Sequence, residues 1–392
     1  MGIFRKKPKE EIIAVIDLGS ASVGGMLIKK SVSSEPEIIT STRVPINFLM
    51  DVDFQAFWRC TINSFTMAMN QLLKDYPKGP DKILCVLSHL WGMSQTRIIK
   101  IKKEQPFEVD KNFLDKIIDN EIKIFKMQNQ NKVSDSKGQQ ELIEYKIMRT
   151  SLNGYEIKDP FNKTAKRFSV YIHIGLVENS IKEILENNIL KNFGDVPIIF
   201  HSLPLIVFTF FKNIIDTDES FIFINIGGET SDISLVRRSV LEETISFPRG
   251  KNFLIRRVAS KFKTFINDAF SIVNSYKEGH AASSVSEKLT PIIEDAKNEW
   301  RGFLEKALKE ISQESPLPKK IFVVSNKGAV YEFIECLKDE SLAKFTILAK
   351  PFEIEIVSPD ALKNYFKFKR SFDSDNDVFL MIESLFADKF LD

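Results

Sequence analysis

A carboxylate, a glycine and two serines stand together at residues 17–22, which read Asp-Leu-Gly-Ser-Ala-Ser between two apolar stretches. A glycine-containing turn can hold phosphate with its backbone N–H groups, and a carboxylate at a strand end can hold a hydrated Mg²⁺. The turn therefore predicts a phosphate site in which Asp17 also serves as a metal ligand. Its candidate residues are Asp17, Gly19, Ser20, Ala21 and Ser22. An ordinary β-hairpin with a polar turn is the alternative interpretation.

The same pattern occurs again at residues 221–236, where an apolar strand, a glycine-containing turn and a second strand follow one another. The candidate phosphate-binding residues of this second turn are Gly227, Gly228, Thr230 and Ser231. Two hairpins of one kind predict two similar domains. The chain of 392 residues is long enough for both, because a single core stops growing near ~250–300 residues.

Apolar patterns predict the elements that position these turns. Residues 12–16 are continuously apolar, which is typical of a strand buried on both faces. Further on, helices are expected at 54–75, 109–127 and 178–192, and strands at 83–88, 95–101, 141–149 and 167–174. This mixture predicts a small α+β module at about residues 82–195, set inside the first domain. His201 lies alone in an apolar run and is expected to be a hydrogen-bonded core residue.

The paired hairpins resemble those of the actin-like ATPase superfamily, and the specific matches are Gly19, Gly227, Gly228, Thr230 and Asp232. This resemblance implies an α/β fold of two actin-like (ribonuclease H-like) domains around a nucleotide cleft. It also implies ATP with Mg²⁺ as the bound cofactor. The expected domains are residues 12–205 and 206–392, after a basic tail at 1–11.

A second motif narrows the resemblance. The turn Asn153-Gly154-Tyr155, followed by Asp159-Pro160, is similar to FtsA of bacterial cell division, with PilM of the type IV pilus platform second. An FtsA-like role implies a cytoplasmic scaffold at the inner face of the membrane, with a tubulin-like division protein as partner. A PilM-like role implies pilus platform proteins instead. Self-association is a further expectation, and a carbohydrate kinase, which shares both hairpins, is the enzymatic alternative.

Several positions depart from the superfamily pattern. Asn225 replaces the aspartate of the second hairpin, and Glu229 replaces its third glycine. On the nucleoside side, only Gly328 and Ala329 match the expected glycine turn, and residues 269–273 lack both charges of the ribose-contacting helix. Because Asn cannot orient a magnesium-bound water as a carboxylate does, and an inward-pointing Glu would repel phosphate, we expect weak ATP binding. No catalytic residue is predicted, and little or no ATPase activity is expected.

Composition excludes other classes of function. Lys and Arg number 55 against 53 Asp and Glu, so the charge offers no footprint for nucleic acid. The three cysteines lie far apart and predict neither a zinc site nor a disulfide framework. No apolar run approaches the ~18 residues of a membrane span, and the basic tail would hold an anionic membrane only weakly.

The last segment, residues 377–392, has an apolar stripe opposite an acidic face. An acidic face is repelled by anionic lipid, so packing as the last core helix is favoured over a membrane anchor. We therefore expect a cytoplasmic protein that contacts the membrane at most peripherally.

Overall fold

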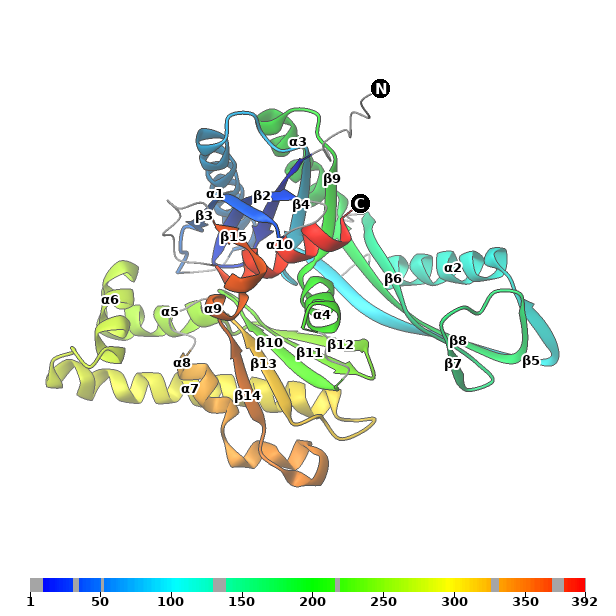
Figure 1. The fold of residues 1–392 in the computed structure, drawn as a ribbon. Helices are drawn as coiled ribbons and strands as arrows, with labels where there is room; N and C mark the ends of the chain where they lie inside the picture. The colour runs from blue at the N-terminus through cyan, green and yellow to red at the C-terminus, as the bar shows by residue number, and fades with distance from the viewer. Residues whose placement is uncertain are drawn as a thin grey trace.

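The computed structural model describes residues 10–30, 35–50, 53–129, 139–215, 219–325, 331–368 and 377–391. Three β-sheets organise this part of the chain. Two of them form domains that lie one above the other in Figure 1, and the third forms a module that projects to one side.

The first sheet contains six strands in the order β15-β3-β2-β1-β4-β9. Their bounds are Glu11–Leu18 (β1), Ser22–Lys30 (β2), Glu37–Pro45 (β3), Lys82–Leu87 (β4), Ile198–Ser202 (β9) and Lys367–Phe368 (β15). Strands β1, β2 and β3 are antiparallel, whereas β4 runs parallel to β1 and β9 parallel to β4. Helices α1 (Phe54–Asp75) and α3 (Asn179–Phe193) pack with this sheet. Strand β1 is buried from Ile12 to Leu18, as its apolar run predicts.

The second sheet repeats this topology in the order β12-β11-β10-β13-β14. Its strands are Phe221–Ile226 (β10), Ser231–Arg237 (β11), Val240–Phe247 (β12), Lys320–Val324 (β13) and Glu353–Val357 (β14). Again the first three strands are antiparallel, and the last two run parallel to the first. Four helices accompany it: Lys251–Phe262 (α5), Ile266–Lys277 (α6), Ser283–Ile311 (α7) and Tyr331–Leu337 (α8). Short helical turns follow at Glu340–Phe345 (η1), Ile347–Ala349 (η2), Pro359–Leu362 (α9) and Lys363–Tyr365 (η3).

The third sheet forms the inserted module, in the order β5-β8-β6-β7. Its elements are Gly92–Val109 (β5), Gln140–Leu152 (β6), Tyr155–Ile157 (β7), Lys163–Glu178 (β8) and the helix Lys111–Asn129 (α2), which covers one face. The module is shorter than the expected 82–195. Strand β4 pairs with β1 and β9, and α3 packs against α1, so both belong to the first domain.

The C-terminal segment does not belong to the second domain, which was expected to extend over residues 206–392. Strand β15 pairs with β3, and helix α10 (Val378–Phe390) packs against α4 (Leu203–Asn213), β1 and β2. The chain therefore returns to the first sheet instead of ending in the second domain, since the apolar side chains of α10 find their partners there. The expectation of a final core helix is confirmed, because nine of its residues are buried.

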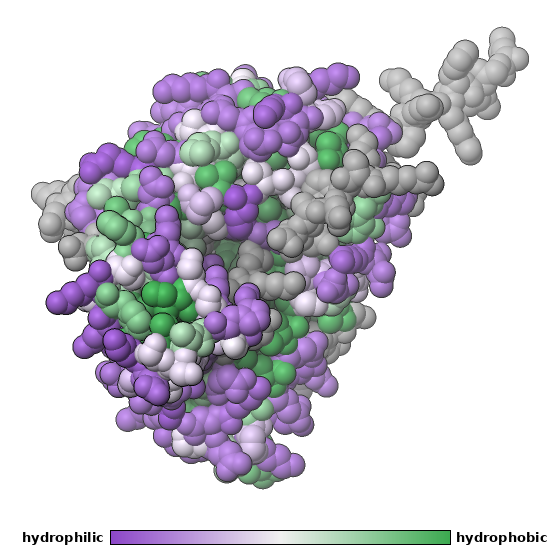
Figure 2. All heavy atoms as spheres, turned by 90° about the vertical axis from the view of Figure 1, so that its left-hand side faces the viewer, coloured by the Kyte–Doolittle hydropathy of each residue, from purple (hydrophilic) through white to green (hydrophobic). Residues whose placement is uncertain are grey.

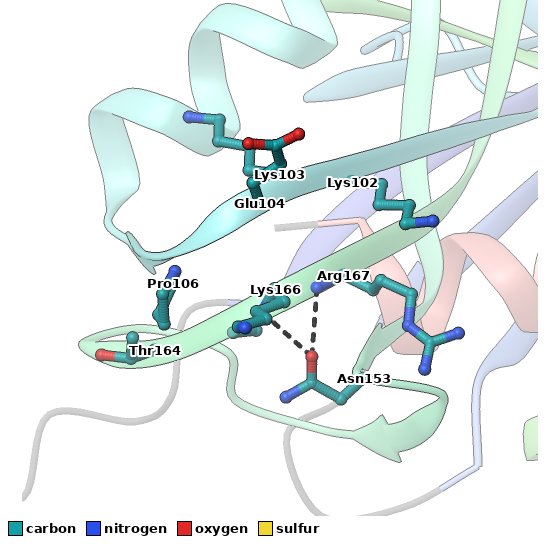
Figure 3. Close-up of a pocket in the computed structure, with 9 residues that line it drawn as sticks. Lys102, Lys103, Glu104, Pro106, Asn153, Thr164, Lys166 and Arg167 are labelled. Atoms are coloured by element: carbon teal, nitrogen blue, oxygen red, sulfur yellow. Dashed lines mark hydrogen bonds between the residues drawn. The ribbon is translucent and has the colours of Figure 1, made fainter.

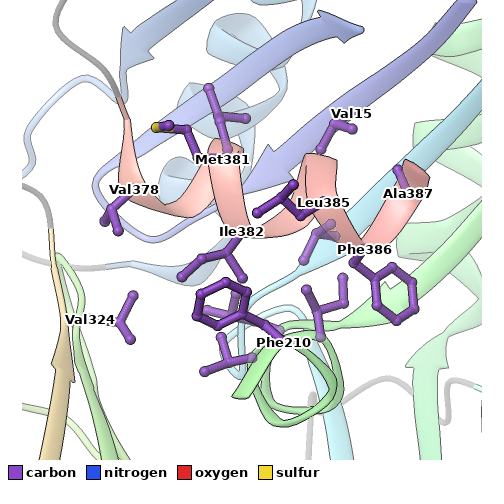
Figure 4. Packing of buried hydrophobic residues seen from close by; sticks show 14 of the residues in the cluster. Val15, Phe210, Val324, Val378, Met381, Ile382, Leu385, Phe386 and Ala387 are labelled. Carbon is purple, nitrogen blue, oxygen red and sulfur yellow. The ribbon is translucent and has the colours of Figure 1, made fainter. Parts of the chain in front are cut away.

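One hydrophobic core joins the two domains. It takes side chains from both sheets, from α4 and from α10; Figure 4 shows Val15, Phe210, Val324, Met381 and Phe386 among them. Helix α4 is buried over Leu203 to Phe211, consistent with the apolar sequence of that stretch, in which Thr209 is the one polar residue. Each large apolar side chain buried in this way stabilises the fold by roughly 1.5–3 kcal/mol. The shared core thus holds the two sheets against each other.

The surface carries no broad apolar area on the face shown in Figure 2, where hydrophilic side chains dominate and hydrophobic ones gather in separate patches. Among the described residues, no helix has the combined length and hydrophobicity of a membrane-crossing segment.

Candidate functional site

The two predicted turns face each other across one small cavity. Eight of the predicted residues line it: Asp17, Gly19, Ser20, Ala21, Ser22, Gly227, Gly228 and Thr230. The β1–β2 and β10–β11 hairpins bring them together, each at the end of the central strand of its sheet. The cavity has a volume of about 50 Å³. Pockets for small-molecule ligands typically measure roughly 300–1,000 Å³, so this space is much smaller than a nucleotide site.

Direct contact between the turns explains the small volume. The backbone N–H groups of Gly228 and Glu229 donate to Ser20 Oγ at 3.0 and 3.1 Å. A Cβ atom added to Gly228 would lie 2.5 Å from Ser20 O and 2.7 Å from the Ala21 Cβ. The backbone of one domain therefore touches the other, and the Ser20 hydroxyl takes the position at the two amides where a phosphate oxygen was expected.

Asp17, the predicted metal ligand, is paired with a cation of its own sheet. Arg43 on β3 donates from Nη2 to Asp17 Oδ2 at 2.7 Å and from Nη1 to Ser22 Oγ at 3.0 Å. Its Nε donates to Asp377, the residue that caps α10. Burial raises the pKa of Asp17 although Arg43 opposes the shift, and Asp377 and Asp17 raise the pKa of Arg43 against the effect of burial. The carboxylate is thus already engaged by a guanidinium.

A second buried acid lies behind this cluster. Glu383 on α10 is completely buried, and neither of its carboxyl oxygens has a hydrogen-bond partner among the described residues. Burial raises its pKa well above the ordinary value, and the nearby charge of Asp17 adds to this effect. Burial therefore favours the neutral form of Glu383 over the charged form. Lys251, which begins α5 and lines the cavity, has a pKa lowered by burial and by Arg43.

In the second hairpin, the two departures from the superfamily pattern have defined partners. Asn225 Nδ2 donates to Asp232 Oδ2 at 3.1 Å, and both side chains are buried. The Glu229 carboxylate accepts from Asn252 Nδ2 at 2.7 Å and from Arg256 Nη2 at 2.6 Å. Glu229 does not line the cavity, so the inward-pointing Glu considered from the sequence is not what the structure has.

Of the three remaining predicted residues, only Ser231 is among those that the structure describes. Ser231 is completely buried behind the turn, where its hydroxyl donates to Arg249 O at 2.6 Å and accepts from Trp300 Nε1 at 3.1 Å. These bonds give Ser231 a structural role and leave it off the cavity wall. Gly328 and Ala329 lie outside the described residues, although the neighbouring Ser325 lines the cavity.

On the side expected to hold the nucleoside, the domains are also in contact. Arg256 on α5 donates from Nε to Leu49 O at 2.9 Å and lies over the Phe48 ring at 4.7 Å. Phe48 in turn meets Phe270 on α6 edge to face, with 6.0 Å between ring centroids. Residues of the first domain therefore cover the part of α6 that the superfamily pattern assigns to ribose.

Sequence reasoning missed Arg43, Asp377 and Arg256, since none of them belongs to a recognisable motif. One signal was present in the first hairpin. Gly24 pairs with Arg43 in the sheet, and a Cβ on Gly24 would lie 2.5 Å from Arg43 Nη2. A glycine inside a strand often marks the close approach of another group, which here is the Arg43 side chain.

A buried polar cluster fixes the inserted module to the first domain. Glu144 on β6 accepts from the Ser202 backbone N–H at 3.2 Å and from the Ser202 hydroxyl, and it lies 2.5 Å from His201 Nδ1 and 3.4 Å from His173 Nε2. Burial opposes its charge, yet the hydrogen bonds from His173 and His201 lower the pKa of Glu144 to about 2. His201 is hydrogen-bonded, as expected, and its ring meets Phe386 edge to face.

Two sheets of ribonuclease H-like topology, joined by one core and facing each other through their first hairpins, define an actin-like fold. No protein-family model and no curated protein sequence matches the chain. Among solved structures, the PilM–PilN type IV pilus biogenesis complex is similar with a TM-score of 0.61 and 14% identity, over 94% of this chain and 97% of that one.

Two further structures match less well in shape. A Bacteroides thetaiotaomicron protein with actin-like ATPase fold and unknown function has a TM-score of 0.42 at 11% identity, over 97% of this chain and 98% of that one. The ethanolamine utilization protein EutJ from Carboxydothermus hydrogenoformans also has a TM-score of 0.42, at 10% identity over 90% and 85%. At 14% identity the likeness to the PilM–PilN complex concerns the fold alone, and it confirms the expected fold class.

The residues present do not fit Mg–ATP in this arrangement. The Asp17 carboxylate is paired with Arg43, the amides of the second turn hold Ser20, and Asn225 supplies no negative charge. Phosphoryl transfer depends almost entirely on positioning and on electrostatic stabilisation by metal ions and cations. Chemically, the arrangement is suited to holding two domains together.

Proposed function

We propose that this chain is an actin-fold scaffold whose domains are closed on each other by side chains instead of by nucleotide, and that it acts by binding other proteins. The observation that carries the proposal is the contact of Ser20 Oγ with the Gly228 and Glu229 amides. In that position a hydroxyl of one domain satisfies the backbone donors of the other. Closure then requires no bound phosphate.

The electrostatics of the cleft support the same proposal. Arg43 forms ion pairs with both Asp17 and Asp377, and burial favours the neutral form of Glu383, so each of the two paired carboxylates already contacts a cation of the protein. A buried charge without a partner would cost several kcal/mol, which explains why these groups occur together.

For the partner, the similarity to the PilM–PilN complex favours a pilus-type assembly platform. The structural similarity extends over almost the whole of both chains and therefore includes the inserted module as well as the two domains. We infer a scaffold at the cytoplasmic face of the membrane that binds pilus platform proteins, with self-association as a second mode of assembly.

A division scaffold similar to FtsA, with a tubulin-like partner, is the second candidate. The observation that favours it is the Asn153-Gly154 turn of the motif, which joins β6 to β7 with φ angles of 52° and 93°. Asn153 Oδ1 also accepts from the backbone N–H groups of Lys166 and Arg167, so the motif residues shape the module.

Calorimetry with ATP, with and without Mg²⁺, tests the proposed closure. We expect no saturable binding within the ~1 μM to 1 mM range typical of enzyme substrates, and no turnover. Robust hydrolysis near ~1–100 s⁻¹, as in kinases, would contradict the proposal.

Depletion of the protein in its own host separates the two candidate roles. Loss of surface pili with normal division supports the pilus-type platform, whereas filamentous cells that keep their pili support the division scaffold. If both processes continued unchanged, the proposed partner classes would be wrong, whatever the result with ATP.

A further inference from the structure

A basic groove lies at the outer end of the inserted module, away from the cleft. Strands β5 and β8 and the β6–β7 turn enclose a hollow of about 800 Å³. Four cations line it, Lys102, Lys103, Lys166 and Arg167, against the single carboxylate of Glu104. We call these five residues, with Asn153, the module groove; Figure 3 shows how they lie around it.

A large bulge in β5 opens the groove. Strand β5 pairs with β8 up to Lys102, which faces Arg167, and pairing resumes where Phe107 faces Ala165. Four residues of β5 therefore stand opposite Lys166 alone. Bulges of this kind bend a strand and re-aim its side chains.

The opposite wall is fixed by the β6–β7 turn. Asn153 Oδ1 accepts from the backbone N–H groups of Lys166 and Arg167 at 3.0 and 3.1 Å, and Asn153 N donates to Arg167 O at 2.7 Å. Figure 3 shows the first two of these bonds. Because they involve the main chain of β8, they hold Lys166 and Arg167 in place whatever their side chains do.

The cations of the module groove are not neutralised within the described part of the chain. No carboxylate there forms an ion pair with Lys102, Lys166 or Arg167, whereas Arg97, further back along β5, pairs with Glu121. Lys102 and Arg167 stand directly opposite each other on adjacent strands, an arrangement that destabilises a sheet when both residues carry the same charge. A concave group of cations kept together against their own repulsion is suited to an anionic partner.

Beyond the groove, on the face of the sheet that α2 leaves open, Lys100 stands opposite Ser169 and Ile98 opposite Tyr171. Ile98 is 46% exposed, and Arg149 lies over the Tyr171 ring at 4.2 Å. Strand β5 is also an edge of its sheet, where an extended segment can add as a further strand. A flat lipid surface would not enter a hollow, and the net charge of +2 offers nucleic acid no broad basic face.

From this geometry we propose that the module groove binds an acidic, extended peptide segment of a partner protein. Carboxylates of the segment pair with Lys102, Lys166 and Arg167, while its backbone lies along the β5 edge. This site is separate from the interdomain cleft and does not depend on how the cleft treats nucleotide.

The test uses the full chain and a fluorescein-labelled, glutamate-rich synthetic peptide, followed by fluorescence anisotropy at low and high salt. We expect saturable binding that weakens with salt and falls roughly tenfold or more in the double variant Lys166→Glu/Arg167→Glu. The milder Lys166→Gln/Arg167→Gln variant should lose part of the affinity, and it keeps the test decisive if charge reversal disturbs folding. Lys116 and Lys123, exposed on α2 and outside the groove, provide the matched control Lys116→Glu/Lys123→Glu, expected to bind like the wild type.

Equal loss in the control variant would mean that bulk charge attracts the peptide, and it would overturn the proposal. Absence of binding at low salt would do the same. Tighter binding of phosphatidylglycerol vesicles or of a single-stranded oligonucleotide, lost in the Lys166→Glu/Arg167→Glu variant, would also overturn it, because the ligand would then belong to another class.

Discussion

Arg43 Nη2 lies 2.7 Å from Asp17 Oδ2, and this contact places a guanidinium against the carboxylate that the sequence pattern assigns to a metal ion. The same side chain reaches Ser22 of the first turn and Asp377 at the start of α10. Arg43 therefore ties the first hairpin to the C-terminal helix. In the proposed scaffold this link takes the place of a bound cation.

Replacing Arg43 with Ala tests that link. The change removes the cation that contacts both buried carboxylates, Asp17 and Asp377, so we expect the free energy of unfolding at pH 7 to fall by about 3 kcal/mol or more. Urea denaturation provides the measurement. Arg59→Ala, at an exposed position of α1, is the control and should change stability by no more than about 0.5 kcal/mol. Similar losses in both variants would show that the Arg43 cluster contributes little.

The Ser20 hydroxyl is expected to stabilise closure of the cleft. In Ser20→Ala the N–H groups of Gly228 and Glu229 lose their acceptor, which should cost about 1–3 kcal/mol. Hydrogen exchange measured by mass spectrometry should show faster exchange at these two amides. Ser260→Ala, an exposed serine of α5, should leave their exchange unchanged. Unaltered protection in Ser20→Ala would contradict the proposed closure.

Glu383 should make stability depend on pH. Its pKa is raised in the folded state, so between the unfolded and folded values the folded protein binds more protons than the unfolded one. Stability is then lost as pH rises above the ordinary glutamate pKa of 4.5, by at most about 1.4 kcal/mol per pH unit from this group. Glu383→Gln should remove that slope and be more stable than the wild type at pH 8. If the free energy of unfolding changed with pH in the same way for both proteins from pH 5 to about 8, the pKa of Glu383 would not be raised in the folded state.

The pH dependence of stability that we expect from Glu144 is opposite in sign to that from Glu383. With a pKa lowered from 4.5 to about 2, its contribution is present above the unfolded pKa and is lost as pH falls toward 2. Glu144→Gln should therefore lower the free energy of unfolding at pH 7 by about 3 kcal/mol, and this deficit should shrink in acid.

An independent variant disturbs the same cluster. A Cβ atom on Gly175 would lie 2.6 Å from Glu144 Cγ, so Gly175→Ala should displace the carboxylate and loosen the module. The rate of hydrogen exchange in β5 and β6 should rise in Gly175→Ala and in Glu144→Gln. Gly302→Ala is the control, because a Cβ there meets nothing within 4 Å. If Gly175→Ala behaved like Gly302→Ala, the cluster would not be what anchors the module.

The sequence by itself determined the local elements and the fold class. Helix α1 occupies residues 54–75 as its apolar spacing predicts, and β1 and β10 are the expected buried strands at the start of the two hairpins. The last segment forms a core helix, because its apolar stripe needs a partner surface. Such patterns depend on neighbours a few residues apart, so they can be read along the chain.

Only the tertiary structure decided what fills the space between the hairpins. Arg43 and Asp377 are 334 residues apart, and Ser20 and Gly228 are 208 apart. These pairs meet because β15 and α10 return to the first sheet and one core presses the two sheets together. No local pattern records such a meeting, since it depends on strand register and on the packing of both domains at once. In the proposed closure, Arg43 and Asp377, which lie outside the superfamily motifs, act together with the motif residue Ser20.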